Sequence, residues 1–240
     1  MAVSTIRLRR REEVAEQTMA FHFDKPPDFQ FKAGQTMDLT LVDPRETDAE
    51  GNIRTFSIAS APQEPELMIA TRMRDTAFKR VLKSLPMGAP LQVDGPMGSF
   101  TLHRNAAKPA VFLAGGIGIT PFRSMAHDAV AQKLPHALYL FYSNNRPEDA
   151  AFLDDLQKLA DTSSTFHFVP TMTEMARSRR PWRGLTGFID RQMLLGHLSN
   201  LQGPIYYSAG PPAMVAAMRQ MLTSAGVDED DIRTEEFAGY

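Results

Sequence analysis

Residues 112–122, FLAGGIGITPF, decide how the second half of this 240-residue chain folds. The apolar run that ends at Ala114 is typical of a buried strand, and three glycines follow within four positions. Glycine lets the backbone turn sharply and approach another group closely. Thr120 suits the N-cap of a following helix, and Pro121 suits its first position. The stretch predicts a strand, a tight turn and a helix whose free N-terminal amides suit a pyrophosphate.

The spacing of these glycines differs from two familiar nucleotide-binding patterns. It is not the G-x-G-x-x-G spacing of the common dinucleotide fingerprint, and no Gly-Lys-Ser/Thr follows as in a Walker A loop. The alternative interpretation is a strand-to-helix turn that needs glycine for its geometry alone.

Around this turn the second half of the chain alternates between strand and helix patterns. Such alternation predicts a parallel sheet with helices on both faces, which binds ligands at the carboxyl ends of its strands. The expected strands are 109–116, 136–143, 165–172, 203–210 and 231–237, and the expected helices are 120–132, 147–161, 188–198 and 211–226.

The first hundred residues read instead as short strands separated by Pro, Gly and Asp clusters, which indicates an antiparallel barrel or sandwich. One helix interrupts them at 75–86, with Thr76 as its expected N-cap. We expect two domains, residues 1–104 and 105–240, with a hinge near 102–109.

Composition narrows the function. The chain has no cysteine, which excludes disulfides, a cysteine nucleophile and cysteine-ligated iron–sulfur or zinc sites. The net charge of −2 gives no reason to expect a nucleic-acid or membrane partner. The longest uncharged stretch, 109–122, is too short to span a bilayer, and the charged first residues lack a signal-peptide core. We therefore expect a cytoplasmic protein.

Seven motifs in order resemble the ferredoxin–NADP reductase superfamily. They are FKAGQ (31–35), RTFSIAS (54–60), DGPMGSF (94–100), AGGIGITPF (114–122), FYSNNRPEDAAF (141–152), SAGPPAMV (208–215) and EEFAGY (235–240). The resemblance implies an antiparallel Greek-key β-barrel that binds FAD rather than FMN, followed by an α/β parallel-sheet domain that binds NADPH or NADH.

The resemblance also gives roles to the residues of the first domain. Arg54, next to Thr55, would pair with the FAD pyrophosphate, since a planar guanidinium suits phosphate oxygens. Phe56 would pack on the flavin, and Ser57 would direct its hydroxyl toward the flavin N5. An ordinary barrel strand with a surface arginine is the alternative. The first backbone amides of the next helix, those of Ala77, Phe78 and Lys79, would face the same pyrophosphate. A helix with an ordinary N-cap and no ligand explains this stretch of sequence equally well.

In the second domain the resemblance assigns the nicotinamide nucleotide. Ser143 and Arg146 are candidates for gripping a 2′-phosphate. The loop 177–184 adds further arginines, whose number favours NADPH, but a solvated basic loop is the alternative and NADH stays open. Ala209 stands where the superfamily usually has Cys, which puts the positioning of the nicotinamide in question. The residues implied for the pyrophosphate and its second turn are Gly115, Gly116, Gly118, Thr120, Gly210 and Pro211.

The end of the chain resembles the superfamily's Glu-x-aromatic ending. Glu235 would lie near the nicotinamide and Ser57, and Phe237 would cover one flavin face and yield to the nicotinamide. Tyr240 is a rival for that stacking role, and a frayed chain end is the alternative. Ser57, Glu235 and Phe237 are therefore the expected catalytic residues.

These features predict a flavin-dependent reductase that takes hydride from NAD(P)H onto FAD and passes electrons singly to a separate acceptor. Because the chain has no cysteine for a cluster of its own, the expected acceptor is a ferredoxin, a flavodoxin or an oxygenase component. An acidic partner would bind either the loop 177–184 or the N-terminal arginines, which are Arg7, Arg9, Arg10 and Arg11. A role of these charges in solubility explains both groups equally well. A regulatory or small-molecule (ferric or flavin) reductase module with weak hydride transfer is one alternative, and a dehydrogenase without flavin is another.

Overall fold

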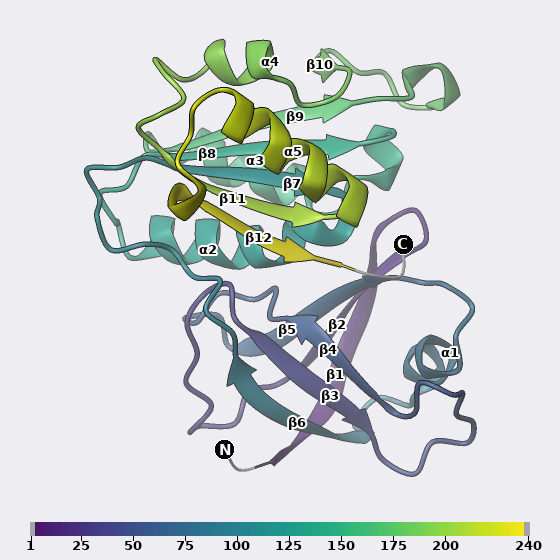
Figure 1. Ribbon diagram of the computed structural model, residues 1–240. Helices are drawn as coiled ribbons and strands as arrows, with labels where there is room; N and C mark the ends of the chain where they lie inside the picture. Colours follow the sequence, from purple (N-terminus) through teal and green to yellow (C-terminus); the bar gives the residue numbers. More distant parts are fainter. Residues whose placement is uncertain (1–2, 238–240) are drawn as a thin grey trace.

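The computed structural model describes residues 3–237, which form two six-stranded sheets joined by residues 98–109 (Figure 1). The first sheet is antiparallel and barrel-like, and the second is parallel with helices on both faces. Both halves of the predicted fold are thus confirmed. The expected boundary between residues 104 and 105 falls within the connection between the sheets.

The first sheet has the strand order β4-β3-β6-β1-β2-β5. Strand β6, the last of this sheet along the chain, pairs with β1 and β3 and not with β5, which precedes it in sequence. Such a non-sequential order is typical of Greek-key connections. The strands are β1 (Ser4–Ala15), β2 (Thr18–Asp24), β3 (Thr36–Leu41), β4 (Ile53–Ser57), β5 (Glu66–Arg72) and β6 (Pro90–Met97), and helix α1 (Ala77–Ser84) lies between β5 and β6.

The second sheet has the strand order β10-β9-β8-β7-β11-β12, and all its pairs are parallel. The strands are β7 (Ala110–Gly115), β8 (Leu138–Asn144), β9 (Phe166–Met172), β10 (Leu185–Thr186), β11 (Ile205–Gly210) and β12 (Ile232–Glu236). The helices are α2 (Ile119–Ala131), α3 (Leu153–Asp161), α4 (Arg191–Leu195) and α5 (Pro212–Ser224).

Period-two patterns explain how the strands form. In β3, Met37, Leu39 and Leu41 are buried in the barrel core while the residues between them are half-buried. In β7 every residue is buried, because both faces of the parallel sheet are covered. Phe112 packs on the side of α2 and α3, whereas Val111 packs on the side of α4 and α5.

Two helices and one strand differ from the sequence prediction. The Thr76 N-cap of α1 is confirmed, since its hydroxyl accepts from the Lys79 amide at 3.4 Å. The expected N-cap at Thr120 is wrong: a 3₁₀ turn over Gly116–Gly118 winds directly into α2, which begins at Ile119. The predicted helix 147–161 is also broken, because Phe152 has a left-handed backbone with φ of 60°. The short strand β10 was not predicted.

The glycine turn packs against the backbone at the end of β11. A Cβ on Gly118 would lie 2.3 Å from the carbonyl oxygen of Ala209 and 2.6 Å from the nitrogen of Gly210. A Cβ on Gly115 would lie 2.3 Å from the sulfur of Met214. Glycine at 118 is therefore required by packing between two neighbouring strand ends, which supports the geometric interpretation of this position.

The two sheets share one apolar core. Phe100, in the connection between them, packs on Phe122 of α2 at 5.8 Å between ring centroids and on Tyr207 of β11 at 5.6 Å. Barrel residues such as Ala59 and Met68 belong to the same buried cluster. The barrel and the parallel sheet are therefore packed together and not merely tethered.

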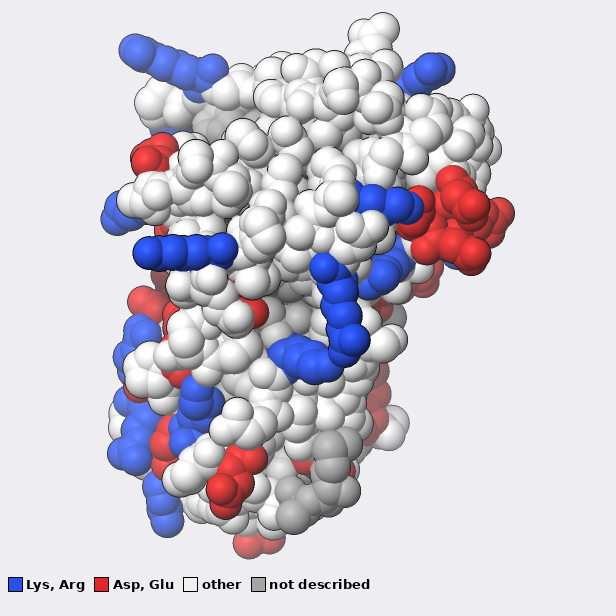
Figure 2. Space-filling view, turned by 90° about the vertical axis from the view of Figure 1, so that its left-hand side faces the viewer, with Lys and Arg blue, Asp and Glu red and all other residues white. Residues whose placement is uncertain are grey.

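Two further features of the molecule are the apolar character of its helices and the distribution of charge on one face. In the part of the chain that the structure describes, no helix has the length and apolar character needed to cross a membrane. Figure 2 shows the face at the amino ends of the parallel strands, where blue and red side chains are interspersed apart from one red group at its right.

Gly118→Ala tests the packing of the turn. The new methyl group would meet backbone atoms that cannot rotate away, so we expect the free energy of unfolding to fall by about 2 kcal/mol or more. Gly196→Ala is the control, since a Cβ there would make ordinary contact at 3.4 Å, and we expect a change below about 1 kcal/mol. Equal denaturant midpoints for both variants would contradict the packing argument.

Candidate functional site

Two pockets lie on either side of the glycine turn. The barrel-side pocket has a volume of about 540 Å³, and the sheet-edge pocket has a volume of about 590 Å³. Volumes of this size are typical of sites for organic ligands. The barrel-side pocket is lined by Glu50, Arg54, Thr55, Phe56, Ser57, Ala70, Thr71, Arg72, Arg74, Thr76, Lys79, Ile117, Thr120 and Phe237. The sheet-edge pocket is lined by Arg72, Gly115, Gly116, Ser143, Asn144, Asn145, Thr173, Phe188, Ile189, Pro211, Ala213, Met214, Ala217 and Met218.

Arg54 and the start of α1 converge on one carboxylate. The guanidinium of Arg54 lies 3.2 Å from Asp48 and 2.8 Å from Glu50, and it stacks over Phe78 at 5.2 Å. The amide of Ala77 donates to Asp48 at 3.1 Å. Desolvation raises the pKa of Asp48, but the amide bonds and Arg54 outweigh it, so the pKa lies below its usual value. Arg54 and the first turn of α1, which the sequence predicts to bind a pyrophosphate, thus both bind the carboxylate of Asp48.

Lys79 adds a further cationic side chain to the same pocket, which Arg54, Arg72 and Arg74 also line. Burial, followed by the charges of Arg74 and Arg54, lowers the pKa of its ammonium group. An anionic ligand in this pocket would stabilise the charged form of Lys79, because the ligand would offset the neighbouring positive charges. The predicted contribution of α1 therefore includes the Lys79 side chain as well as backbone amides.

The rest of the RTFS motif also lines this pocket. Phe56 packs on Phe78 at 5.9 Å between ring centroids, and the hydroxyl of Thr55 donates to Asp38. Ser57 is only 4% exposed, and its hydroxyl has no hydrogen-bond partner within the described protein. Buried polar groups are almost always paired, so Ser57 indicates that a bound molecule supplies the partner.

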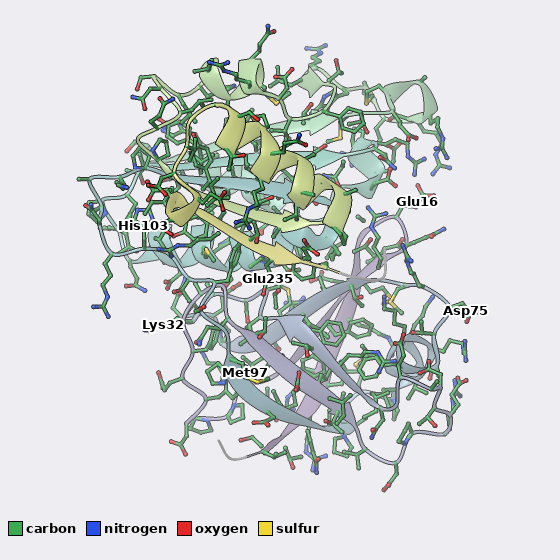
Figure 3. All side chains as sticks on the ribbon, in the orientation of Figure 1. Glu16, Lys32, Asp75, Met97, His103 and Glu235 are labelled. Atoms are coloured by element: carbon green, nitrogen blue, oxygen red, sulfur yellow. The ribbon has the colours of Figure 1, made fainter. Side chains whose placement is uncertain are left out.

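Glu235 lies on β12, beside Ala209 of β11, where the parallel sheet meets the barrel (Figure 3). Its Oε2 atom is buried and also lacks a partner within the described residues. Burial raises the pKa of this carboxyl to about 7. Phe237 follows and lines the barrel-side pocket, whereas Tyr240 lies outside the described residues.

Arg72 is a site residue that sequence reasoning missed. It ends β5 and lines both pockets, so a barrel residue reaches the edge of the parallel sheet. Its Nε atom is buried without a partner among the described residues. In the sequence, Arg72 is recognisable only as an arginine at the end of a mostly apolar strand. The neighbouring residues do not show which domain or ligand its side chain faces.

The sheet-edge pocket brings together residues from three strand ends. Gly115, Ser143 and Pro211, which the sequence assigns to the nicotinamide nucleotide, line it. Asn144 is 5% exposed, and both atoms of its amide group lack partners among the described residues, while Phe188 is 79% exposed at the same pocket. These last two residues were not predicted, although an exposed aromatic beside a predicted site is a recognisable sign of a stacking surface.

Several predicted residues do not line the pocket to which they were assigned. Gly118 and Gly210 serve the packing of the two turns, and Gly210 has φ of 150°. Thr120 lines the barrel-side pocket, and its hydroxyl donates to the carbonyl of Ile117 at 3.1 Å.

Arg146 is separated from Ser143. Its guanidinium binds Asp149 at 2.7 Å and Glu16 at 3.0 Å, and its side chain is 18% exposed. It lines a smaller pocket together with these two carboxylates. The pair predicted to grip a 2′-phosphate is therefore not brought together.

The N-terminal arginines expected to receive a partner are also engaged. Arg9 pairs with Asp24 at 3.3 Å, and Arg10 pairs with Glu12 at 2.9 Å and Glu66 at 3.1 Å. Arg7 and Arg11 donate to the carbonyl groups of Gly88 and Leu85.

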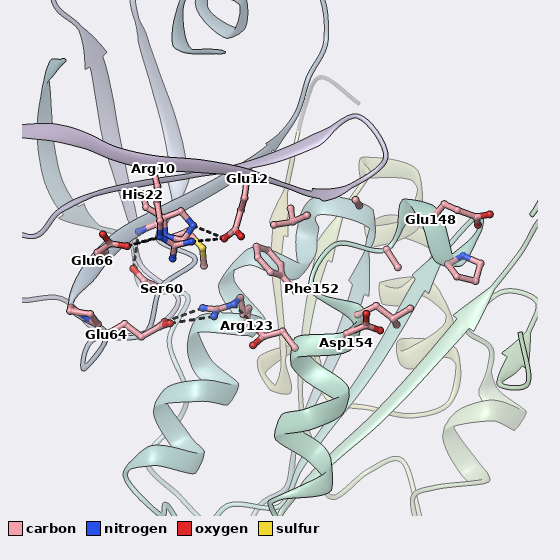
Figure 4. Close-up of a pocket in the computed structure, with 18 of the residues that line it drawn as sticks. Arg10, Glu12, His22, Ser60, Glu64, Glu66, Arg123, Glu148, Phe152 and Asp154 are labelled. Carbon is pink, nitrogen blue, oxygen red and sulfur yellow. Dashed lines mark hydrogen bonds and ion pairs between the residues drawn. The ribbon is translucent and has the colours of Figure 1, made fainter. Parts of the chain in front are cut away.

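An interdomain crevice of about 380 Å³ lies between the barrel and α2 and α3 (Figure 4). Arg123 of α2 donates to the carbonyl of Ala59 at 2.9 Å and to Glu64 at 3.0 Å, both in the connection between β4 and β5. It also pairs with Asp155 of α3 at 2.9 Å. With only 7% of its surface exposed, Arg123 ties the two domains together beside their shared core.

The described residues 3–237 contain no group of three or more His, Asp or Glu side chains placed to hold a metal ion. Several buried unpartnered atoms of the described residues, those of Ser57, Arg72 and Asn144, line the two pockets, which suits organic cofactors with hydrogen-bonding edges and phosphates.

Comparison with known proteins identifies the fold and the family. Residues 112–220 match the model of the oxidoreductase NAD-binding domain. The whole structure aligns with a ferredoxin NADP⁺ reductase from Neisseria gonorrhoeae with bound FAD and NADP, with a TM-score of 0.79 and 23% identity over 98% of each chain. This likeness concerns the fold.

Two curated relatives are similar over most of this chain. The reductase subunit of glycine betaine monooxygenase from Chromohalobacter salexigens is 29% identical over 92% of this chain, which spans 60% of that protein's length. Several other relatives are matched over 49% of their length. Ferredoxin–NADP reductase B from Sorangium cellulosum is 30% identical over 87% of this chain and 86% of its own length. The chain therefore belongs to the ferredoxin–NADP reductase superfamily.

Proposed function

We propose that the chain is an FAD-dependent NAD(P)H oxidoreductase, with FAD in the barrel-side pocket and the nicotinamide nucleotide in the sheet-edge pocket. Bound flavin supplies the ability to take up a hydride and release its electrons singly. The observation that carries the proposal is Arg72, whose unpartnered Nε lies where the two pockets adjoin. Ser57 and Glu235 add two more buried polar atoms that need partners near this junction.

Arg54, Lys79 and the first amides of α1 would hold the FAD pyrophosphate. In binding it they would exchange the carboxylates of Asp48 and Glu50 for phosphate oxygens, which accept charge-assisted hydrogen bonds equally well. Phe56 would supply a flat apolar surface for the flavin.

Ser57, Glu235 and Phe237 would serve the transfer itself. The Ser57 hydroxyl can donate or accept a hydrogen bond, and the Glu235 carboxyl can hold or release a proton near neutral pH. Phe237 lines the barrel-side pocket and would yield its place to the nicotinamide.

Gly115, Gly116 and Pro211 would form the cradle for the nicotinamide nucleotide, because they join the ends of β7 and β11 at the sheet-edge pocket. Ala209 places a methyl group where the superfamily usually has a thiol, but the paired backbone of β11 and β12 at this position is regular. The cradle would therefore position the nicotinamide without a contact from sulfur.

The electron acceptor would be a separate protein, namely a ferredoxin, a flavodoxin or an oxygenase component. The name of the relative that is the reductase subunit of glycine betaine monooxygenase supports this class of partner. A small-molecule reductase with weak hydride transfer is the second candidate, and Ala209 is the observation that favours it. Turnover with a ferric chelate but not with any of the three protein classes would favour the second candidate.

Anaerobic rapid mixing of the purified protein with NADH or NADPH tests the function. We expect a yellow protein whose flavin absorbance bleaches within about a second with at least one nucleotide, given the usual range of turnover. A yellow protein that neither nucleotide bleaches would contradict the oxidoreductase, and a protein that cannot be reconstituted with FAD would favour a dehydrogenase without flavin.

Arg54→Ala tests the FAD site. Loss of charge-assisted hydrogen bonds worth about 1.5–3 kcal/mol should weaken FAD binding by about 10-fold to 100-fold, measured by flavin fluorescence on titration of the stripped protein. Arg9→Ala is the control, since Arg9 is also a barrel arginine paired with a carboxylate but lies outside the pocket. Full retention of FAD by Arg54→Ala would show that the strand has another role.

Glu235→Gln tests the buried carboxyl. Burial raises the pKa of this carboxyl from its ordinary value of 4.5, which applies in the unfolded chain, to about 7 in the folded state. The carboxyl therefore favours folding most below pH 4.5, and this contribution is lost as the pH rises through 7. We therefore expect the Tm of the wild type to fall relative to that of Glu235→Gln between about pH 5 and about pH 8. Glu236→Gln, at the exposed neighbouring position, is the control. Parallel Tm curves for the wild type and Glu235→Gln would exclude the raised pKa.

A further inference from the structure

We propose that the sheet-edge pocket selects NADH over NADPH, an inference that rests on the proposed oxidoreductase function. The two nucleotides differ only in the 2′-phosphate of the adenosine ribose, which carries between one and two negative charges at neutral pH. The choice therefore depends on which charged side chains surround the adenosine end of the pocket.

The order of the strands shows where the adenosine would lie. The barrel-side pocket reaches the glycine turn at Ile117 and Thr120 and the end of β12 at Phe237. The nicotinamide must approach from this side, since it reacts with the flavin. With the pyrophosphate at the glycine turn, the adenosine then extends the other way along the sheet edge, over the ends of β8 and β9.

The side chains at these two strand ends are neutral. They are Ser143, Asn144 and Asn145 at the end of β8 and Thr173 after β9, with the exposed ring of Phe188 beside them. Hydroxyl and amide groups both donate and accept hydrogen bonds, which suits a ribose diol. The unpartnered amide of Asn144 is already buried at this position. Among the described lining residues the only positive charge is Arg72, which lies toward the barrel.

The arginines that favoured NADPH in the sequence are occupied or elsewhere. Arg146 is held by Asp149 and Glu16. Arg177 pairs with Glu174 at 2.6 Å, and Arg179 pairs with Glu16 at 3.3 Å. The remaining arginines of this loop do not line the pocket in the described structure: Arg180 lines the interdomain crevice, and Arg183 is not among the residues of the sheet-edge pocket. To bind the guanidinium of Arg146, Arg177 or Arg179, a 2′-phosphate would thus have to replace the carboxylate that each of them already holds.

Glu174 lies next to the adenosine end of the pocket, and its carboxylate pairs with Arg177 at 2.6 Å. It directly follows Thr173, and its amide donates to the carbonyl of Asn145 at 2.8 Å, so it is anchored between two pocket residues. A carboxylate near the ribose can accept hydrogen bonds from the 2′-hydroxyl of NADH but repels the 2′-phosphate of NADPH. Charges within about 8 Å are only partly screened at physiological salt.

Calorimetric titration of the FAD-loaded protein with NAD⁺ and NADP⁺ tests the inference independently of catalysis. We expect NAD⁺ to bind about tenfold more tightly or better, and flavin bleaching to show the same ratio in its second-order rate constants. Equal affinities, or tighter binding of NADP⁺, would overturn the selectivity even if both reduced nucleotides bleach the flavin. Failure of both to bleach would overturn the proposed function, while the binding ratio would still decide the selectivity.

Glu174→Gln tests the contribution of the carboxylate. We expect the affinity for NADP⁺ to rise about threefold to tenfold, with a smaller change for NAD⁺, because repulsion is removed and Arg177 is freed. Glu229→Gln is the matched control, since Glu229 forms a similar surface pair with Arg219 at 2.8 Å outside the pocket. If the ratio of affinities for Glu174→Gln equals that of the control, Glu174 does not determine the selectivity.

Discussion

The contact between Gly118 and the backbone of Ala209 and Gly210 is the constraint on which the site depends. Because there is no room for a side chain at this contact, the ends of β7 and β11 approach each other closely and the chain turns directly into α2. One side of the turn then faces the barrel through Ile117 and Thr120, and the other faces the sheet edge through Gly115. The close packing at Gly118 thus places the barrel-side pocket and the sheet-edge pocket on the two sides of one short turn.

Two ligands can react across this turn only if the domains keep their relative position. The structure achieves this with an apolar core shared by both sheets and with Arg123, which binds a barrel carbonyl and carboxylates from both domains. Arg72 extends the barrel toward the sheet-edge pocket on the opposite side of the turn. The polar contacts of the interface therefore set orientation, and the apolar contacts supply most of its stability.

Most of the fold was predictable from the sequence because its signals are local. Alternating and continuous apolar runs located the strands, and the RTFS residues line the pocket assigned to them. The errors concern distant partners: Arg146 is held by Glu16, which lies 130 residues away in sequence, and no local pattern places Arg72 between two pockets. The glycine turn was recognised, but its 3₁₀ start removed the capping role of Thr120 because the chain has no extended residue there.

Ala209 has a consequence for the durability of the enzyme. Reduced flavoproteins in air can generate peroxide, and a thiolate beside the reacting centre is the first group that peroxide converts to sulfenic acid. With a methyl group at this buried position and no cysteine anywhere in the 240 residues, the site offers neither oxidants nor alkylating agents a sulfur nucleophile. The substitution that removes a positioning contact thereby also removes the most vulnerable atom from the neighbourhood of the cofactor.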